Sequence, residues 1–212
     1  GLGDVYKRQL NYYPARQLRE DQYQFAWYAY GKDYHDLMKT RLTSLQAYIS
    51  AHSPLPLQSR VFCDTAPVLE RYWAYRAGLG WIGKNTQLII PHAGSCFFLG
   101  ELFLDMEVDE YDQPQKNRCG NCTRCIQACP TKALEAPFLL NSRRCLSYLT
   151  IESRDAIPLL EGKKMGNKIY GCDECQKACP WNKFATPCQT PELQPTELFL
   201  SLIHISEPTR RT

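Results

Sequence analysis

Seven of the eleven cysteines fall into two runs of a type that binds iron–sulfur clusters. The first run, CGNCTRCIQACP at residues 119–130, has four cysteines, and the last of them precedes a proline. The second run, CDECQKACP at residues 172–180, ends in the same way but has one cysteine fewer. The C-x-x-C-x-x-C spacing places three thiolates on one concave side of a loop, where they can hold three irons of a [4Fe–4S] cluster. The fourth thiolate must come from another part of the chain.

A rule for proteins with two such clusters assigns the remaining ligands. The cysteine before the proline ligates the cluster of the other run, which assigns Cys179 to the first cluster and Cys129 to the second. The second cluster then lacks one ligand, and Cys145 is the only cysteine between the runs. The sequence therefore predicts two [4Fe–4S] clusters, one on Cys119, Cys122, Cys125 and Cys179, the other on Cys129, Cys145, Cys172 and Cys175.

A pair of zinc sites is the alternative, because zinc binds thiolates of two C-x-x-C knuckles in a tetrahedron. The triple spacing that ends in C-P is not a knuckle pattern and favours iron. The odd number of cysteines argues against a disulfide framework and indicates a reducing cytosol. Cys63, Cys96 and Cys188 lie outside both sets, and we expect buried thiols there.

The first half of the chain mixes helices and strands. Residues 33–52 predict a helix that Asp33 caps and that Pro54 and Pro56 end. Residues 60–64 predict a strand, and residues 65–80 a second helix with Pro67 in its first turn and Gly78 as its C-cap. The apolar face predicted for the first helix consists of Leu37, Met38, Leu42, Leu45, Tyr48 and Ile49.

An antiparallel hairpin is expected next, with arms at 86–90 and 96–108. An acidic series is interpreted as a solvated strand edge that leads into a linker; its members are Glu101, Asp105, Glu107, Asp109, Glu110 and Asp112. The segment 109–117 is polar and has no apolar periodicity, so we place a domain boundary near residue 113.

The length of 212 residues suits one large or two small domains. We expect an α+β or α/β domain at 10–113, an iron–sulfur domain at 114–188 with an insertion at 141–170, and the start of a further region at 189–200. Residues 1–9 and 201–212 match nothing around them and resemble translated sequencing-adapter sequence. They are expected to be non-native tails on an internal fragment of a longer protein.

Positive charge is concentrated in the cysteine-rich part. Residues 116–184 carry twelve Lys/Arg and six Asp/Glu, a net charge of +6, whereas residues 1–115 have a net charge of −2. Two oxidised clusters with their thiolates each carry about −2, which leaves about +2. The apolar runs are far shorter than the roughly 18 residues of a membrane span, and no secretion leader opens the chain. We therefore expect neither membrane insertion nor secretion.

Several segments together resemble the epoxyqueuosine reductases, in order and in spacing. They are YAYGKDYH, DTAPVLER, AGLGWIGKNTQLI, FFLGEL and the two cysteine runs with GCDECQKACPWN, and the resemblance covers residues 10–200. It implies a cytoplasmic, cobalamin-dependent enzyme that reduces epoxyqueuosine at the wobble position of a tRNA anticodon to queuosine. It further implies a cobalamin-binding α/β domain, a bacterial-ferredoxin-like domain with two [4Fe–4S] clusters, a low-potential electron donor and a monomer.

The same resemblance assigns roles to single residues. Asp64 matches the catalytic acid of the family, and a carboxyl group beside an apolar corrin face should have a raised pKa. Cobalamin contacts are expected from Gly83, Lys84, Asn85, Leu88, Ser147, Thr150 and Asp173. Without the resemblance, Asp64 or Thr65 would be interpreted as a helix cap. The segment GLGWIGKN matches neither a dinucleotide-binding nor a P-loop pattern.

Histidine ligation of cobalt is not expected, because His35, His52, His92 and His204 lie in no ligand-like setting. Phosphate contacts with tRNA are expected from the insertion, although a solvated basic face is the plain alternative. The basic residues concerned are Arg143, Arg144, Arg154, Lys163, Lys164 and Lys168.

Three other functions stay open. They are an electron-transfer ferredoxin domain fused to an unrelated module, another corrinoid reductase similar to the reductive dehalogenases, and a zinc-stapled nucleic-acid binder. The basic insertion and the YGKDYH segment favour the tRNA enzyme. Corrinoid binding would exclude a plain electron carrier, and iron analysis would exclude the zinc protein.

Overall fold

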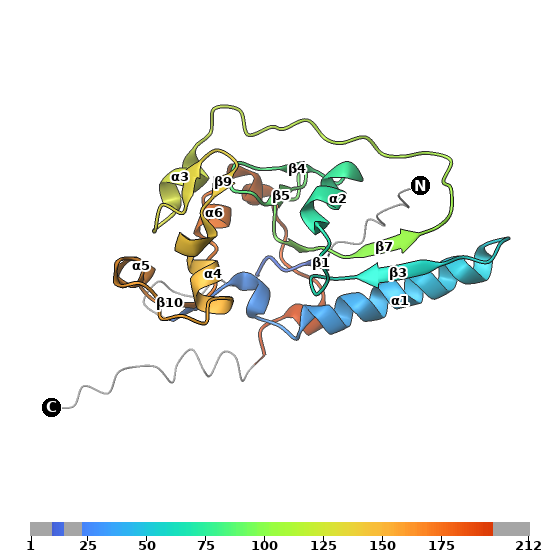
Figure 1. Cartoon of the computed structure of the whole chain (residues 1–212), viewed down its shortest axis with the longest axis horizontal. Coiled ribbons are helices and arrows are strands. Elements are labelled where there is room, and N and C mark those ends of the chain that lie inside the picture. Colours follow the sequence, from blue (N-terminus) through green and yellow to red (C-terminus); the bar gives the residue numbers. More distant parts are fainter. Residues whose placement is uncertain (1–9, 15–22, 197–212) are drawn as a thin grey trace.

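The computed structural model describes residues 10–14 and 23–196 of the chain. The two predicted tails, His204 and residues 197–200 lie outside the described residues. In Figure 1, helix α1 (Tyr34–His52) runs along strands β3 (Ser59–Phe62) and β7 (Glu101–Leu104). The two strands pair antiparallel, with Ser59 opposite Leu104 and Phe62 opposite Glu101.

Helix α1 confirms the predicted first helix and its cap. The side chain of Asp33 accepts a hydrogen bond from the backbone N–H of His35 at 2.9 Å. Met38 and Leu42 are buried against the strands, because residues four apart share one helix face. The prediction was wrong for Tyr48, which is 63% exposed and stacks on the ring of His52.

The second helix is shorter than expected. Helix α2 spans Glu70–Arg76, so Pro67 lies in an irregular stretch before it and not in its first turn. No side chain caps α2, which excludes the interpretation of Asp64 or Thr65 as a helix cap. Gly78 follows the C-cap residue, Ala77, with φ of 72°, a left-handed conformation that favours glycine. The helix therefore ends one residue earlier than predicted.

The predicted hairpin does not form, because each of its arms pairs with another strand. Strand β5 (Leu88–Ile89) pairs with β4 (Trp81–Ile82), and β6 (Phe97–Phe98) pairs with β1 (Leu10–Asn11). Only an isolated bridge between Ile90 and Gly94 remains of the expected turn. The connection between β4 and β5, at residues 83–87, is shorter than the one between β5 and β6, so it costs less entropy to close. Glycine suits position 83 in this turn, because a Cβ there would lie 2.5 Å from Cδ1 of Ile89.

The prediction of a solvated acidic edge was wrong for Glu101. This residue is fully buried at the start of β7, whereas Asp105, Glu107 and Asp109 further along are exposed. Its strand is covered by neighbouring elements on both faces, which a count of charges along the sequence does not show. The three cysteines outside the predicted cluster sets, Cys63, Cys96 and Cys188, are buried as expected.

The second half consists of short elements around the cysteines. They are α3 (Arg124–Ala128), β8 (Leu134–Ala136), β9 (Leu139–Leu140), α4 (Leu146–Ile151), α5 (Leu159–Met165), β10 (Lys168–Tyr170) and α6 (Glu174–Lys177). Strands β8 and β9 pair antiparallel. Helices α3 and α6 pack against each other. Single 3₁₀ turns lie at Trp27–Ala29, Ser142–Arg144, Pro180–Phe184 and Pro191–Leu193.

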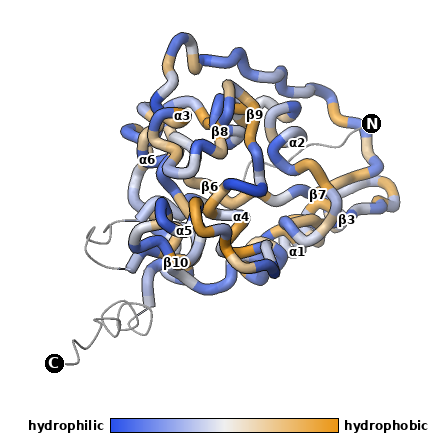
Figure 2. Tube along the Cα trace, turned by 60° about the vertical axis from the view of Figure 1, so that its left-hand side comes forward, coloured by the Kyte–Doolittle hydropathy of each residue, from blue (hydrophilic) through white to orange (hydrophobic). Residues whose placement is uncertain are grey.

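The two halves interlock around an irregular connection. Strand β2 (Gln24–Phe25) pairs in parallel with β10 of the second half. The connection from β7 to α3 carries mostly hydrophilic residues and arches over the molecule (Figures 1 and 2). The domain boundary near residue 113 falls within it and stays a prediction. No helix within the described ranges is long and apolar enough to cross a membrane.

Candidate iron–sulfur and cofactor site

The four cysteines predicted for the first cluster surround one small cavity. Cys119 and Cys122 come from the loop before α3, Cys125 from α3, and Cys179 from the N-cap of the 3₁₀ turn that follows α6. The loop closes on itself through a 3.0 Å hydrogen bond from the N–H of Cys122 to the carbonyl of Cys119. Two distant segments of the chain thus bring four thiols together, in the grouping that the crossing rule predicts.

The four cysteines of the second predicted set also gather. Cys129, Cys145 and Cys175 lie in one packed cluster, and Cys172 is close enough to Cys175 to raise the pKa of its thiol. The backbone N–H of Ala133 donates to the Sγ of Cys129 at 3.2 Å. Hydrogen bonds of this kind are common at cluster thiolates, where they stabilise negative charge.

The thiols of both groups favour their protonated form when no metal is present. Burial is the main cause that raises the pKa of Cys125, Cys175 and Cys179, and neighbouring thiols of the same set raise it further. Four thiolates this close repel one another unless a metal core compensates their charge.

The zinc alternative is addressed by one observation. Among the described residues, no three His, Cys, Asp or Glu side chains form a group that could hold a single metal ion. Iron analysis of the protein remains the test that separates zinc sites from iron–sulfur clusters.

A second, larger cavity of about 760 Å³ lies between the two halves. Asp64, Tyr34 and Glu70 line one part of it, and Cys145, Cys172 and Cys175 line another. This volume is in the range of cavities that hold organic cofactors. The cavity thus places the second thiol group beside a space large enough for a substantial ligand.

Two residues of the cavity wall have buried polar atoms without partners. The Nδ2 of Asn85 and the Oγ1 of Thr86 have no hydrogen-bond partner among the described residues, and both residues line the cavity. An unpaired buried donor is costly, so a ligand with polar groups is expected to satisfy these atoms. Apolar residues such as Leu88 and Leu99 line the same cavity. A corrin ring with peripheral amides has both kinds of surface, so the residues present fit a cobalamin.

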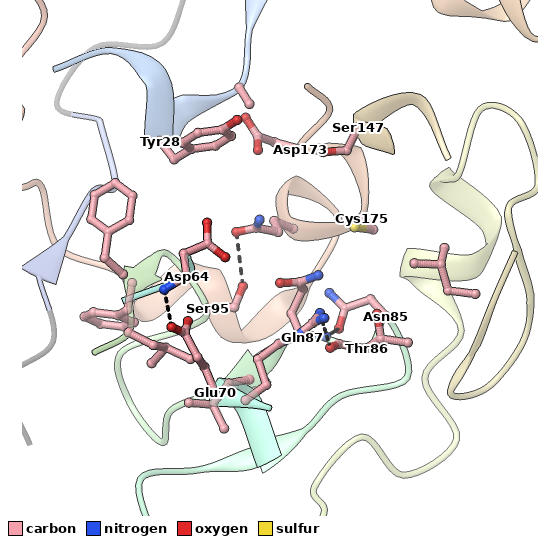
Figure 3. A pocket seen from close by; sticks show the side chains of 18 of the residues that line it. Tyr28, Asp64, Glu70, Asn85, Thr86, Gln87, Ser95, Ser147, Asp173 and Cys175 are labelled. Atoms are coloured by element: carbon pink, nitrogen blue, oxygen red, sulfur yellow. Dashed lines mark hydrogen bonds between the residues drawn. The ribbon is translucent and has the colours of Figure 1, made fainter. Parts of the chain in front are cut away.

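Asp64 lies on the cavity wall in an unusual backbone conformation. It follows β3 directly after Cys63, with φ of 55°, and its side chain is 59% exposed. The hydroxyl of Tyr34 donates to its carboxylate, and the Nε2 of His35 lies 3.5 Å from the same oxygen. Figure 3 shows the carboxyl group of Asp64 on the opposite side of the cavity from Asp173 and Ser147.

The predicted cobalamin contacts divide into two groups. Asn85, Leu88, Ser147 and Asp173 line the cavity (Figure 3 labels three of them), whereas Gly83, Lys84 and Thr150 do not.

The three residues outside the lining have other roles. Gly83 permits the tight turn between β4 and β5. The Nζ of Lys84 donates to the carbonyls of Gly120 and Cys122, at 2.6 Å and 3.0 Å, beside the first thiol group. The hydroxyl of Thr150 bonds backbone groups of Leu146 and Gly171. The geometry therefore does not support these three as cofactor contacts.

Asp173 is a buried polar residue of the lining. It is 5% exposed, and its Oδ2 accepts the backbone N–H of Trp27 at 2.7 Å. Burial raises its pKa to about 6, and the bond from Trp27 opposes part of that rise. Asp173 therefore anchors the N-terminal part of the chain to the segment that carries the second thiol group.

Sequence reasoning missed four residues around Asp64. Tyr34 and His35 contact its carboxylate, Glu70 accepts its backbone N–H, and Glu101 lies behind Glu70. Three of these residues lie in the YGKDYH and FFLGEL segments. The resemblance identified these segments but did not predict the contacts with Asp64. The other two described histidines lie elsewhere, His52 against Tyr48 and His92 near Trp181 and Phe184.

The basic insertion is partly neutralised within the structure. Arg144 pairs with Glu161 at 3.4 Å and donates to the carbonyl of Thr131, and Lys168 pairs with Glu174 at 3.4 Å. The exposed cations that remain from the predicted set are Arg143, Arg154, Lys163 and Lys164. The surface open to a polyanion is therefore smaller than the sequence indicates.

Comparison with known proteins gives two family matches. Residues 7–65 match a family described as epoxyqueuosine reductase QueG, DUF1730, and residues 118–182 match a 4Fe-4S double cluster binding domain. All eight of the predicted ligands lie within the second match. The chain thus contains a domain of the double-cluster type.

Two similar proteins of known name are the epoxyqueuosine reductases of Leadbetterella byssophila and Xanthomonas campestris pv. campestris. The first is 46% identical over 197 residues, which are 93% of this chain and 64% of that protein. The second is 53% identical over 169 residues, 80% of this chain and 47% of that protein. The chain therefore spans about half to two thirds of the length of these relatives.

Solved structures agree with this similarity. An epoxyqueuosine reductase with an epoxyqueuosine-modified tRNA-Tyr stem loop matches with a TM-score of 0.80 and 33% identity. A Bacillus subtilis epoxyqueuosine reductase, in a structure with its catalytic loop swung out of the active site, matches with a TM-score of 0.80 and 32% identity. In both cases the match covers 89% of this chain and 50% of the other.

Proposed function

The chain belongs to the epoxyqueuosine reductase family, and on that premise we propose that the protein reduces epoxyqueuosine in a tRNA anticodon to queuosine. One observation carries the proposal: a single cavity has Asp64 on one wall and the thiols Cys145, Cys172 and Cys175 on another. A proton donor and a source of electrons then face the same space. Removal of an epoxide oxygen as water needs both, two electrons and two protons in all.

The eight cysteines would hold two [4Fe–4S] clusters, which would supply single electrons from a low-potential donor. The first set is Cys119, Cys122, Cys125 and Cys179, and the second is Cys129, Cys145, Cys172 and Cys175. Helix α3 contains Cys125 of the first set, α6 contains Cys175 of the second, and the two helices pack together, which favours short transfer distances. Three thiols of the second set line the cavity.

The cavity would hold a cobalamin, which when bound would supply the strongly reducing centre for the epoxide. Asn85 and Thr86 would offer it polar groups, Leu88 an apolar surface, and Ser147 and Asp173 would border it from the side of the second thiol group. Asp64 delivers the proton to the departing epoxide oxygen. Tyr34 and His35 hold its carboxylate in place before that transfer.

The substrate is a tRNA anticodon stem loop, as in the solved relative that contains one. The exposed cations Arg143, Arg154, Lys163 and Lys164 are suited to contacts with its phosphates. We expect a monomer that acts in the cytoplasm, where eleven unpaired cysteines stay reduced.

The deciding experiment is a cobalamin titration of protein reconstituted anaerobically with iron and sulfide. Iron content of about eight per chain is the control for intact clusters. The visible spectrum and the cobalt EPR signal should show tight binding with the lower base detached, and a stem loop carrying epoxyqueuosine should then be converted. If this chain and a full-length relative both contain two clusters but bind no cobalamin, the protein is an electron carrier and not a reductase of epoxyqueuosine.

A further inference from the structure

Two carboxyl groups behind Asp64 have no part in the reduction described above. Glu70 begins α2 and lines the cavity beside Asp64. Glu101 is fully buried in β7, opposite Phe62 of β3, two residues before Asp64 in the chain. A buried acid without a cationic partner is unusual, because burial strongly disfavours its charged form.

The surroundings of Glu101 favour a shared proton. Neither oxygen of Glu101 receives a hydrogen bond from an N–H or hydroxyl group among the described residues. Glu70 lies close enough to shift the pKa of Glu101, and Glu101 in turn shifts that of Glu70. Two ionised carboxylates have only acceptor atoms, so the two groups can bond to each other only while one of them is protonated. Glu101 is the more deeply buried and has no other donor among the described residues, whereas Glu70 accepts the backbone N–H of Asp64, so Glu101 is the better place for the proton.

The charged partner in turn binds the backbone at Asp64. The N–H of Asp64 donates to the Oε1 of Glu70, as the dashed line in Figure 3 marks. Asp64 is a non-glycine residue with φ of 55°, a left-handed conformation that L-residues rarely adopt without compensation. A hydrogen bond from this N–H to a carboxylate is charge-assisted and can supply that compensation.

We propose that Glu70 and Glu101 share one proton and together position Asp64. Glu101 donates to the carboxylate of Glu70, and Glu70 holds the Asp64 backbone so that the Asp64 carboxyl group borders the cavity. Glu70 and Glu101 are thus positioning residues, and this inference rests on the proposed function only for the role of Asp64 itself.

The arrangement makes the Asp64 segment sensitive to alkaline pH. Burial and the nearby charge of Glu70 raise the pKa of Glu101 to about 8. The other ionisable groups near the pair are Asp64 and Cys63 after β3, and His35 and Lys39 on α1. None of these donates to Glu101, so above pH 8 the pair carries two negative charges in a buried place. Their repulsion breaks the shared bond and releases the Asp64 segment.

The test compares the parent with Glu101→Gln and Glu70→Gln in protein with both clusters reconstituted. A Gln at either position keeps one donor between the two side chains at every pH. The carboxamide oxygen of Gln at position 70 can still accept the Asp64 N–H. Glu107→Gln is the matched control, because it makes the same chemical change at an exposed acid further along the same segment.

The first readout is hydrogen exchange of the 63–69 amides, measured by mass spectrometry at pH 7 and pH 9 and corrected for the intrinsic rate. We expect the parent and the Glu107→Gln control to lose protection at least tenfold at pH 9, whereas both partner variants keep it. Equal protection of the parent at the two pH values, or equal loss in all four proteins, would overturn the proposal.

The second readout is turnover of the epoxyqueuosine stem loop as a function of pH. The parent should lose activity above pH 8, and the alkaline limb should move upward in the Glu101→Gln variant. If the alkaline limbs of the parent and the Glu101→Gln variant are identical, the carboxyl pair does not position Asp64. A parent that shows the expected exchange but no turnover would instead contradict the proposed function and leave the carboxyl pair established.

Discussion

Asp64 is held from three directions, by two residues of α1 and by one residue of α2. The Tyr34 hydroxyl donates to its carboxylate, the His35 ring lies 3.5 Å away, and Glu70 binds its backbone. Tyr34 itself stacks on Phe98, so the donor is fixed by packing as well as by its hydrogen bond. A single exposed carboxyl group thereby gains a defined position relative to the cavity.

Asp64→Asn should separate binding from chemistry. The amide has nearly the size of the carboxyl group but does not act as an acid, so turnover should fall by about 100-fold or more. Cobalamin binding, read from the visible spectrum, should be unchanged. Asp36→Asn, at an exposed acid on α1, is the control. Parental turnover in the Asp64 variant would remove the proton-donor role.

At the scale of elements, the second thiol group depends on the insertion between the cysteine runs. Cys145 is the N-cap residue of α4, and the 3₁₀ turn before it carries Arg144, which pairs with Glu161 of α5. Packing within the insertion therefore places a ligand that is distant in sequence from Cys172 and Cys175. The same insertion forms part of the cavity wall through Ser147 and Ile151.

Cys145→Ser should remove one cluster and leave the other. We expect iron to fall from about eight to about four per chain, because the first set of four thiols is untouched. The control is Cys188→Ala, at a buried cysteine outside both sets, which should retain the full iron content. Unchanged iron in the Cys145 variant would mean that the fourth ligand comes from elsewhere.

Helix α5 carries two of the exposed cations on adjacent residues, Lys163 and Lys164. Replacing both by Ala should weaken binding of the stem loop and lower the slope of log affinity against log salt by about 1 to 2, because phosphate contacts release counterions. Arg41→Ala, on the outer face of α1, is the control. A salt slope equal to that of the parent would place the RNA on another face.

At the scale of the whole molecule, Asn182 joins the two halves. It is 6% exposed, accepts the N–H of Ser95 at 2.6 Å and donates to the carbonyl of Gln176 at 2.7 Å. The Cβ of a residue at position 94 would lie 2.2 Å from its Oδ1, so glycine is required for this close approach. One amide thus links the turn after β5 to the segment that ends the second cysteine run.

Asn182→Ala should lower the free energy of unfolding by about 2 to 3 kcal/mol, since it leaves several buried polar groups without partners. The change is measured as a shift of the urea midpoint in reconstituted protein. Gln189→Ala removes a similar group from an exposed position. It should change the free energy of unfolding by less than about 0.5 kcal/mol. Equal shifts would show that the interface contributes little to stability.

The grouping of the cysteines, the first helix and the resemblance could all be predicted from the sequence alone. Cysteine spacing is informative because a cubane needs three thiolates on one short loop. This requirement is local, so it is visible in the sequence. The pattern from Asp33 to Ser53 is equally local, since cap and apolar face lie within one element. These features need no knowledge of which distant segments meet.

Only the tertiary structure decided the strand pairing, the cavity and the environment of Asp64. Strands β5 and β6 are too short to specify a partner by their sequences. Loop closure and burial favour the pairs β5–β4 and β6–β1 over a hairpin between β5 and β6. Glu101 was expected at a solvated edge because its sequence neighbours are acidic, yet its burial depends on α2 and β3. Its contact with Glu70 joins elements 31 residues apart, and such pairs follow from packing in three dimensions alone.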